Sequence, residues 1–142
     1  DVDKGVEDLK DSLAALRGLE SCTGKAGSVG YCLGGKLAFL MATRSDADCN
    51  VAYYGVGLDE LLGEAGNITR PTLLHIAEED EFVPKEAQGK VKEALAGHPQ
   101  VTIHSYPGMP HAFARDGGIH YDAAAATQAN RRTADFLKQH LG

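Results

Sequence analysis

The chain has 142 residues and a formal net charge of −6, from 14 basic and 20 acidic residues. This length suits one domain with a buried core. The lack of a basic stripe argues against nucleic-acid binding, and the isolated basic pair Arg131-Arg132 is expected on a solvated face of a helix. No apolar run approaches the length of a membrane span, so we expect no membrane partner.

The hydrophobic pattern predicts helices and strands in alternation. Apolar residues between positions 2 and 16 recur at spacings of three and four, which predicts an amphipathic helix ending near Gly18. Strands are expected at 25–32, 49–55, 71–77 and 100–106, and further helices at 36–44, 58–65, 84–97 and 121–142. Strands this apolar need cover on both faces, so the predicted fold class is α/β, with a mostly parallel sheet and helices on both faces. No repeat or linker interrupts the pattern, and we take residues 1–142 as a single domain.

The three cysteines, Cys22, Cys32 and Cys49, are an odd number at irregular spacing. This argues against a disulfide scaffold and indicates a reducing cytoplasm. The sequence contains no C-x-x-C or H-x-x-x-H pair, so we expect no metal site.

The stretch "GYCLGGK", Gly30 to Lys36, has two incompatible interpretations. As G-x-x-x-x-G-K it resembles a phosphate-binding loop, but such a loop needs Ser or Thr after the lysine, and this chain has Leu37 there. As G-x-C-x-G it predicts the sharp strand-to-helix turn that presents a nucleophile, with small residues two positions before and after it. The following helix N-terminus is then expected to favour the Cys32 thiolate, and the Leu33 N–H to bind an oxyanion. A third possibility is that Cys32 is simply a small buried apolar residue.

Partners for Cys32 follow later strands, in the order that an elbow-type hydrolase requires. An acid is expected in "EEDEFVP", where Asp80 precedes an apolar anchor, although spacing leaves its neighbours Glu78, Glu79 and Glu81 open.

A histidine is expected in "PGMPHAF", where His111 lies in a loop rich in Gly and Pro and is free to reach Cys32 as a general base. Of the other five histidines, three lie in polar stretches and are expected at the surface, namely His98, His120 and His140. His75 and His104 fall inside predicted strands, where we expect a packed and hydrogen-bonded role.

Together "GYCLGGK", "EEDEFVP" and "PGMPHAFARDG" resemble the three catalytic segments of the dienelactone hydrolase family, the carboxymethylenebutenolidases. The resemblance implies an α/β-hydrolase fold with Cys32 as nucleophile, His111 as base and Asp80 as the group that orients it. It also implies that Arg115 helps to bind a substrate carboxylate and that Tyr54 lines the site, although a solvated arginine and a packed tyrosine are the plainer readings. No cofactor is implied.

The resemblance covers only the later part of the family's domain. The chain also begins with Asp rather than Met, so we expect the early strands to be missing and the domain to be incomplete. The family's early segments supply a second oxyanion N–H, a glutamate that tunes the thiol and another substrate-binding arginine. Without them the strand before Cys32 becomes an edge, which predicts self-association or pairing with another chain.

The expected function is hydrolysis of a small carboxylic ester or enol-lactone through a thioester on Cys32. One alternative is a non-catalytic domain of this fold that acts by association. A nucleotide-binding protein is a weaker alternative, because of Leu37.

Overall fold

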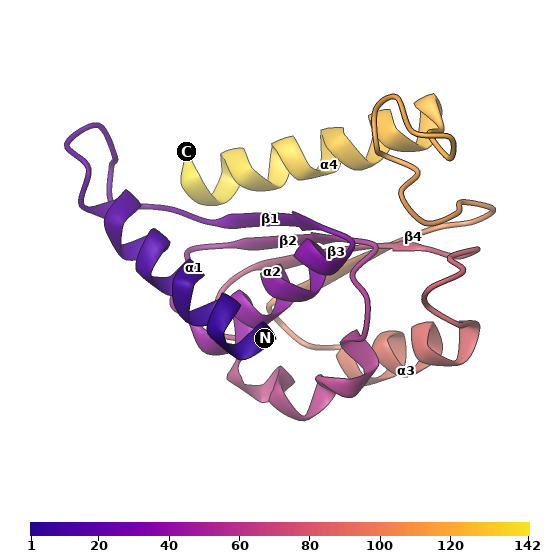
Figure 1. Ribbon diagram of the computed structural model, residues 1–142, viewed down its shortest axis with the longest axis horizontal. Coiled ribbons are helices and arrows are strands. Elements are labelled where there is room, and N and C mark those ends of the chain that lie inside the picture. Colours follow the sequence, from indigo (N-terminus) through magenta and orange to yellow (C-terminus); the bar gives the residue numbers. More distant parts are fainter.

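The computed structural model describes residues 1–142 as a four-stranded parallel sheet with helices on both faces, which confirms the predicted fold class (Figure 1). The strands lie in the order β1-β2-β3-β4, so their order in space follows the chain. The elements are α1 (Val2–Arg17), β1 (Ser28–Tyr31), α2 (Leu33–Arg44), β2 (Asn50–Tyr53), the 3₁₀ helices η1 (Leu58–Glu60) and η2 (Leu62–Asn67), β3 (Thr72–Ala77), α3 (Lys85–Leu95), β4 (Val101–Tyr106) and α4 (Ala123–Leu141).

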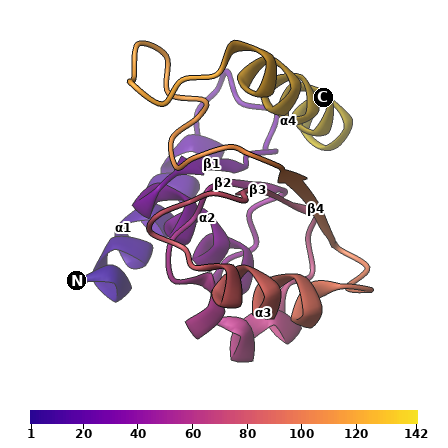
Figure 2. The same ribbon diagram turned by 90° about the vertical axis from the view of Figure 1, so that its right-hand side faces the viewer.

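The helices divide unequally between the two faces of the sheet. Figure 2 shows α3 on one side of the strands and α4 on the other. Side chains of α2 and α3 pack with the β2 and β3 residues Ala52, Leu74 and Ile76, while α4 covers the opposite face through Ala129. The central strands β2 and β3 are buried along their whole length. Both faces of these two strands are therefore covered, as their continuous apolar sequence predicts.

The first helix is tied to the rest of the domain near both ends, and near its start Asp3 accepts from Arg44 of α2 at 2.7 Å. The Asp1 side chain accepts hydrogen bonds from the Asp3 and Lys4 N–H groups and so caps the helix. At the other end Arg17 donates to Asp46 and Asp48, which lie before β2. These contacts hold α1 against α2, with which it shares an apolar cluster.

The short helix expected at 58–65 is present, but it is of the 3₁₀ type and is divided into two parts. The segment forms two 3₁₀ helices instead of one α-helix. Gly57 precedes it in a left-handed conformation with φ of 70°, and Gly63 and Gly66 lower its α-helical propensity.

Two surface assignments from the sequence are wrong. His98 was expected at the surface, but it is half-buried, its Nε2 lies 3.0 Å from Ala65 O, and its Nδ1 accepts from the Gln100 N–H. Arg132, expected on a solvated face of α4, instead lies over the Tyr106 ring and donates to its hydroxyl. Both side chains are fixed by residues distant along the chain, which local polarity does not reveal.

None of the helices combines the length and the apolar character needed to cross a bilayer. The three cysteines are free, and Cys49 is fully buried.

The buried His75 makes the fold sensitive to acid. Burial, followed by the charges of His104 and Arg132, lowers the pKa of His75 to about 3 from its ordinary 6.5. The unfolded chain binds this proton more readily, so stability present above pH 6.5 is lost as the pH falls toward 3. We expect the free energy of unfolding to drop by about 2 kcal/mol from this group between pH 7 and pH 5.

Urea unfolding at several pH values measures this loss. His75→Gln should be less stable at pH 7 but lose this part of the pH dependence, whereas the exposed control His120→Gln should keep the wild-type profile. Equal pH profiles for His75→Gln and wild type would contradict the prediction.

Candidate active site

Cys32 occupies a strained turn between β1 and α2. Its φ is 59° and its ψ is −118°, a conformation that residues with a side chain rarely adopt. The turn is so sharp that a Cβ on Gly30 would lie 1.9 Å from Gly34 O, so residue 30 has to be glycine. The requirement does not extend to Gly34, because a Cβ there would meet no atom within 4 Å. The expectation that both residues must be small is therefore right only for Gly30.

Backbone hydrogen bonds hold this turn from both sides. The Cys32 N–H donates to Tyr53 O at 3.1 Å, and Cys32 O accepts from the N–H groups of Gly35 and Lys36. The Leu33 N–H, in the first turn of α2, donates to no backbone or side-chain group of the chain. Leu33 therefore presents a free donor next to the thiol, as an oxyanion site requires.

The same contacts argue against a phosphate-binding loop. Two N–H groups that could face a phosphate, those of Gly35 and Lys36, are already bonded to Cys32 O. The Lys36 ammonium lies against Gly57, 3.3 Å from the point that a Cβ on Gly57 would occupy. It thus contacts the loop after β2 instead of covering the turn.

Asp80 and His111 form a buried hydrogen-bonded pair. His111 Nδ1 lies 2.8 Å from Asp80 Oδ2, and Asp80 Oδ1 accepts from the Phe82 N–H at 2.9 Å. The side chains of Asp80 and His111 are only 1% and 11% exposed. Both carboxylate oxygens are thus occupied, which fixes the orientation of the imidazole.

The acidic neighbours of Asp80 do not contact His111. Glu78 lies 3.9 Å from Lys92, Glu79 pairs with Lys85, and Glu81 is exposed. Spacing alone left these residues open as alternatives, and the fold directs only Asp80 toward the histidine.

Tyr54 borders both Cys32 and the histidine. It is 3% exposed, and its ring centroid lies 5.1 Å from that of His111 and 5.4 Å from that of Phe113. Burial raises the pKa of the Tyr54 phenol, and the nearby Cys32 contributes to the rise. Cys32 packs on the same apolar cluster, although no hydrogen bond joins its Sγ to His111. Catalytic hydrogen bonds often tighten only in the substrate complex.

Burial raises the pKa of the Cys32 thiol, and the Asp80 charge adds to the rise, while Arg115 acts in the opposite direction. Desolvation and the Asp80 carboxylate thus oppose the thiolate that the α2 N-terminus is expected to favour.

Arg115 is exposed, and its guanidinium makes no hydrogen bond or ion pair with the protein. Its charge nevertheless reaches Cys32. An unpaired cation close to a nucleophile can bind an anionic group of a substrate.

Sequence reasoning missed two residues of the site. The Phe82 ring stands edge-on to His111 at 4.8 Å and is 62% exposed, which makes it an apolar wall beside the imidazole. Ala112, directly after His111, has φ of 65°. Phe82 could have been suggested by its position two residues after Asp80, but nothing in the sequence indicates the conformation of Ala112.

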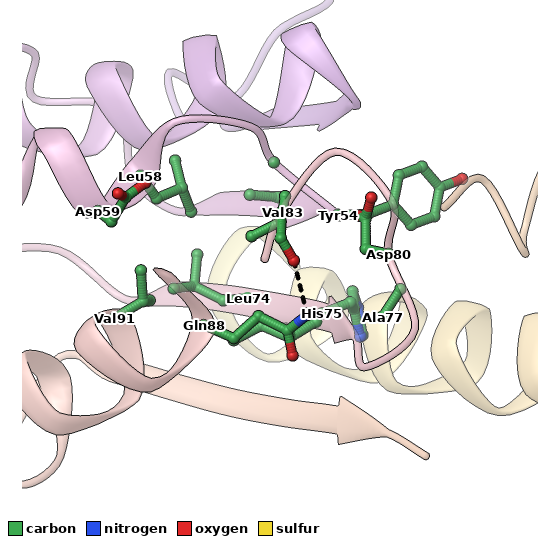
Figure 3. Close-up of a pocket in the computed structure, with 13 residues that line it drawn as sticks. Tyr54, Leu58, Asp59, Leu74, His75, Ala77, Asp80, Val83, Gln88 and Val91 are labelled. Carbon is green, nitrogen blue, oxygen red and sulfur yellow. Dashed lines mark hydrogen bonds between the residues drawn. The ribbon is translucent and has the colours of Figure 1, made fainter. Parts of the chain in front are cut away.

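A small cavity of about 20 Å³ lies beneath Asp80, lined by Tyr54, His75 and Val83 among others (Figure 3). It has room for about one water molecule, so it is too small for an organic substrate. In the same view the Gln88 amide donates to Val83 O at 2.9 Å and so ties the Asp80 loop to α3. No group of three or more His, Cys, Asp or Glu side chains is arranged to hold a metal ion.

A strained residue after one parallel strand, followed along the chain by a carboxylate and a histidine after later strands, is the arrangement of the α/β-hydrolases. Solved structures agree on this fold. A candidate dienelactone hydrolase of Klebsiella pneumoniae matches 94% of this chain and 60% of its own, with a TM-score of 0.81 at 23% identity. The Pyrococcus furiosus esterase Pf2001 matches 99% of this chain and 63% of its own, with a TM-score of 0.76 at 18% identity.

The sequence model of the dienelactone hydrolase family matches residues 1–141, and the chain belongs to this family. A candidate carboxymethylenebutenolidase of Azospirillum brasilense is 64% identical over 110 residues, which cover 78% of this chain and 48% of that protein. Carboxymethylenebutenolidase 1 of Cupriavidus pinatubonensis is 41% identical over 137 residues, which cover 96% of this chain and 58% of that protein. The chain thus spans about half the length of the curated relatives it matches.

The turn at Cys32 predicts opposite outcomes for two neighbouring glycines. Gly30→Ala should destabilise the fold by roughly 3 kcal/mol or more, because its Cβ would overlap Gly34 O and the strained turn has no room to relax. Gly34→Ala is the matched control. It should be neutral or stabilise α2 by up to about 1 kcal/mol, because its Cβ is unobstructed and alanine favours the helix. Urea unfolding of both variants measures the difference, and equal losses would refute this account of the turn.

Proposed function

We propose that this chain carries the catalytic triad of a hydrolase that cleaves small carboxylic esters or enol-lactones. Cys32 is the nucleophile, His111 the general base and Asp80 the residue that orients His111. The observation that carries the proposal is the buried Asp80–His111 pair, at 2.8 Å, in the same site as the strained Cys32. The names of the relatives, carboxymethylenebutenolidases, support an enol-lactone as the substrate class.

The reaction begins from the neutral thiol. As Cys32 Sγ attacks the carbonyl carbon, His111 Nε2 takes the thiol proton, and Asp80 stabilises the imidazolium through Nδ1–H. The oxyanion of the tetrahedral intermediate accepts a hydrogen bond from the Leu33 N–H. When the intermediate collapses, the C–O bond of the ester breaks and the enol leaves with the proton from His111.

Water completes the cycle. His111 takes a proton from water as the oxygen attacks the thioester carbonyl, and the C–S bond then breaks to release the acid and restore the Cys32 thiol. An enol suits this chemistry, because it leaves readily and a thiolate has limited power to expel poor leaving groups. We propose that Arg115 binds a substrate carboxylate and that Tyr54 forms part of the wall.

The oxyanion site within this chain has one donor, the Leu33 N–H. The loss of one such donor typically raises the barrier by about 2.7–4 kcal/mol. We therefore expect slow turnover by this chain alone, and a second donor from outside it. The cytoplasmic location inferred from the cysteines stays a prediction.

Turnover of p-nitrophenyl acetate and of dihydrocoumarin, a phenolic lactone, tests the function. Cys32→Ala, His111→Ala and Asp80→Asn should each lower kcat by about 10³-fold or more. Cys22→Ala, which changes a half-buried thiol outside the site, is the control and should keep the wild-type rate. Mass spectrometry of the quenched reaction should find the acyl group on the Cys32 peptide. Acylation of another residue, or full activity in Cys32→Ala, would refute the mechanism.

The exposed edge of β1 favours a second candidate function, association. Ser28 and Cys32 donate their N–H groups toward β2, so by alternation the backbone groups of Val29 and Tyr31 point away from the sheet. These two side chains are 40% and 48% exposed. A groove of about 360 Å³ runs beside β1, lined largely by apolar side chains that include Leu9, Leu13, Leu16, Leu37 and Met41.

We propose that this edge pairs with an extended strand of a second copy or of another chain. Sedimentation velocity should show a weight-average sedimentation coefficient that rises with protein concentration. Val29→Lys should reduce this rise, because a charge on an edge strand opposes pairing. Leu19→Lys, which places the same charge on an exposed residue outside the groove, should leave it unchanged. A monomer at every concentration, or equal effects of both variants, would contradict self-association through β1.

A further inference from the structure

A network of hydrogen-bonded polar side chains runs through the apolar layer between the sheet and α4. Its five hydrogen bonds join groups from β2, β3, β4 and α4. In order these are Arg132 to Tyr106 at 3.2 Å, Tyr106 to His75 at 2.8 Å, His75 to Thr133 at 2.8 Å, Thr133 to Tyr53 at 2.6 Å and Tyr53 to Asn130 at 2.7 Å. Tyr53, His75, Tyr106 and Thr133 are all buried. Polar groups placed this deep are costly unless every one is satisfied.

The direction of each hydrogen bond in this network follows from its two terminal side chains, Arg132 and Asn130. Arg132 can only donate, so Tyr106 accepts from it and its single hydroxyl hydrogen goes to His75 Nδ1. At the other end the Tyr53 hydroxyl hydrogen points to two acceptors of α4, Asn130 Oδ1 at 2.7 Å and Ala129 O at 3.4 Å, so Tyr53 accepts from Thr133.

These two constraints fix the central residue. The Thr133 hydroxyl has already donated to Tyr53, so its Oγ1 accepts from His75 Nε2–H. His75 is therefore neutral, carries its proton on Nε2 and accepts at Nδ1. Each hydroxyl and imidazole hydrogen of this network then has an acceptor, and loss of the Thr133 hydroxyl would leave the buried His75 Nε2–H without its acceptor.

The same strand residues hold the catalytic segments by their backbones. Tyr53 O accepts from the Cys32 N–H at 3.1 Å, and His75 O accepts from the Tyr54 N–H at 2.8 Å. Tyr54 in turn packs on the His111 ring. Tyr106 O accepts from the Glu78 and Met109 N–H groups, in the segments that lead to Asp80 and His111. Side-chain hydrogen bonds on one face thus fix the residues whose carbonyl groups bind all three catalytic segments.

We infer that this network of hydrogen bonds positions the triad. Thr133 is a positioning residue that acts on Cys32 through Tyr53, and His75 is a positioning residue that acts on His111 through Tyr54. The inference rests on the proposed function, since it concerns how the same site is kept in place. Thr133 is its most informative member, because its hydroxyl is hydrogen-bonded both to Tyr53 of β2 and to His75 of β3.

Thr133→Val tests the inference with a change that keeps the shape of the side chain. It should lower kcat for p-nitrophenyl acetate by about tenfold or more through misplacement of the triad, while KM changes by less than about twofold. It should also change the pH profile of Cys32 alkylation by iodoacetamide. Thr133→Ser, which keeps the hydroxyl, should restore most of the wild-type kcat and most of the wild-type alkylation profile. Thr127→Val is the matched control on an exposed turn of α4 and should behave as wild type.

Two further readouts separate this inference from the proposed function. Nitrogen-15 NMR of His75 should show a neutral ring protonated at Nε2, and the opposite tautomer would overturn the assigned direction. If the wild type does not turn over esters, the proposed function fails, and the alkylation profile of Cys32 in Thr133→Val still tests the positioning. A lower melting temperature in Thr133→Val with unchanged kcat and unchanged alkylation would overturn the inference. If Thr133→Val does not fold, Tyr53→Phe removes the next hydroxyl of the network instead. Its kcat and its Cys32 alkylation profile are then judged in the same way.

Discussion

The strained backbone of the site depends on hydrogen bonds from the ends of the parallel strands. The chain has three residues other than glycine with positive φ, namely Cys32, Tyr54 and Ala112, and all three belong to the site. Such conformations cost on the order of 1–3 kcal/mol each and persist only where the surroundings over-determine them. Here Tyr53 O holds Cys32, His75 O holds Tyr54, and Ala112 O accepts from the Arg115 N–H. The strand residues thus hold the conformations of Cys32 and Tyr54, whereas Ala112 is held by a turn within its own loop.

The parallel arrangement also explains why residues so far apart in sequence meet. All four strands run in one direction, so the segments that follow them leave the same edge of the sheet. Cys32, Tyr54, Asp80 and His111 follow β1, β2, β3 and β4 in turn. The order of the strands in space is the order in the chain, and neighbouring strands therefore contribute neighbouring parts of the site.

This regularity accounts for what the sequence could predict. The strands and helices were found because their apolar patterns are local, and the candidate residues because they follow strands. The sequence favoured Asp80, but spacing alone could not exclude its acidic neighbours, since the selection depends on the Phe82 N–H and on burial against His111. The raised pKa of Cys32 was missed for a similar reason, because desolvation and the Asp80 charge come from the tertiary structure. Arg132 looked like a surface residue until the position of Tyr106 was known.

The electrostatics of the site argue for a concerted first step. In the proposed mechanism Asp80 orients His111, but the Asp80 charge also disfavours a thiolate at Cys32, while the Arg115 charge favours it. A substrate carboxylate bound by Arg115 would neutralise the positive charge that lowers the pKa of the Cys32 thiol. The thiol would then be still harder to ionise in the substrate complex. For the proposed mechanism we therefore expect proton transfer to His111 to accompany formation of the carbon–sulfur bond. The negative charge then develops on an oxygen that the Leu33 N–H can stabilise.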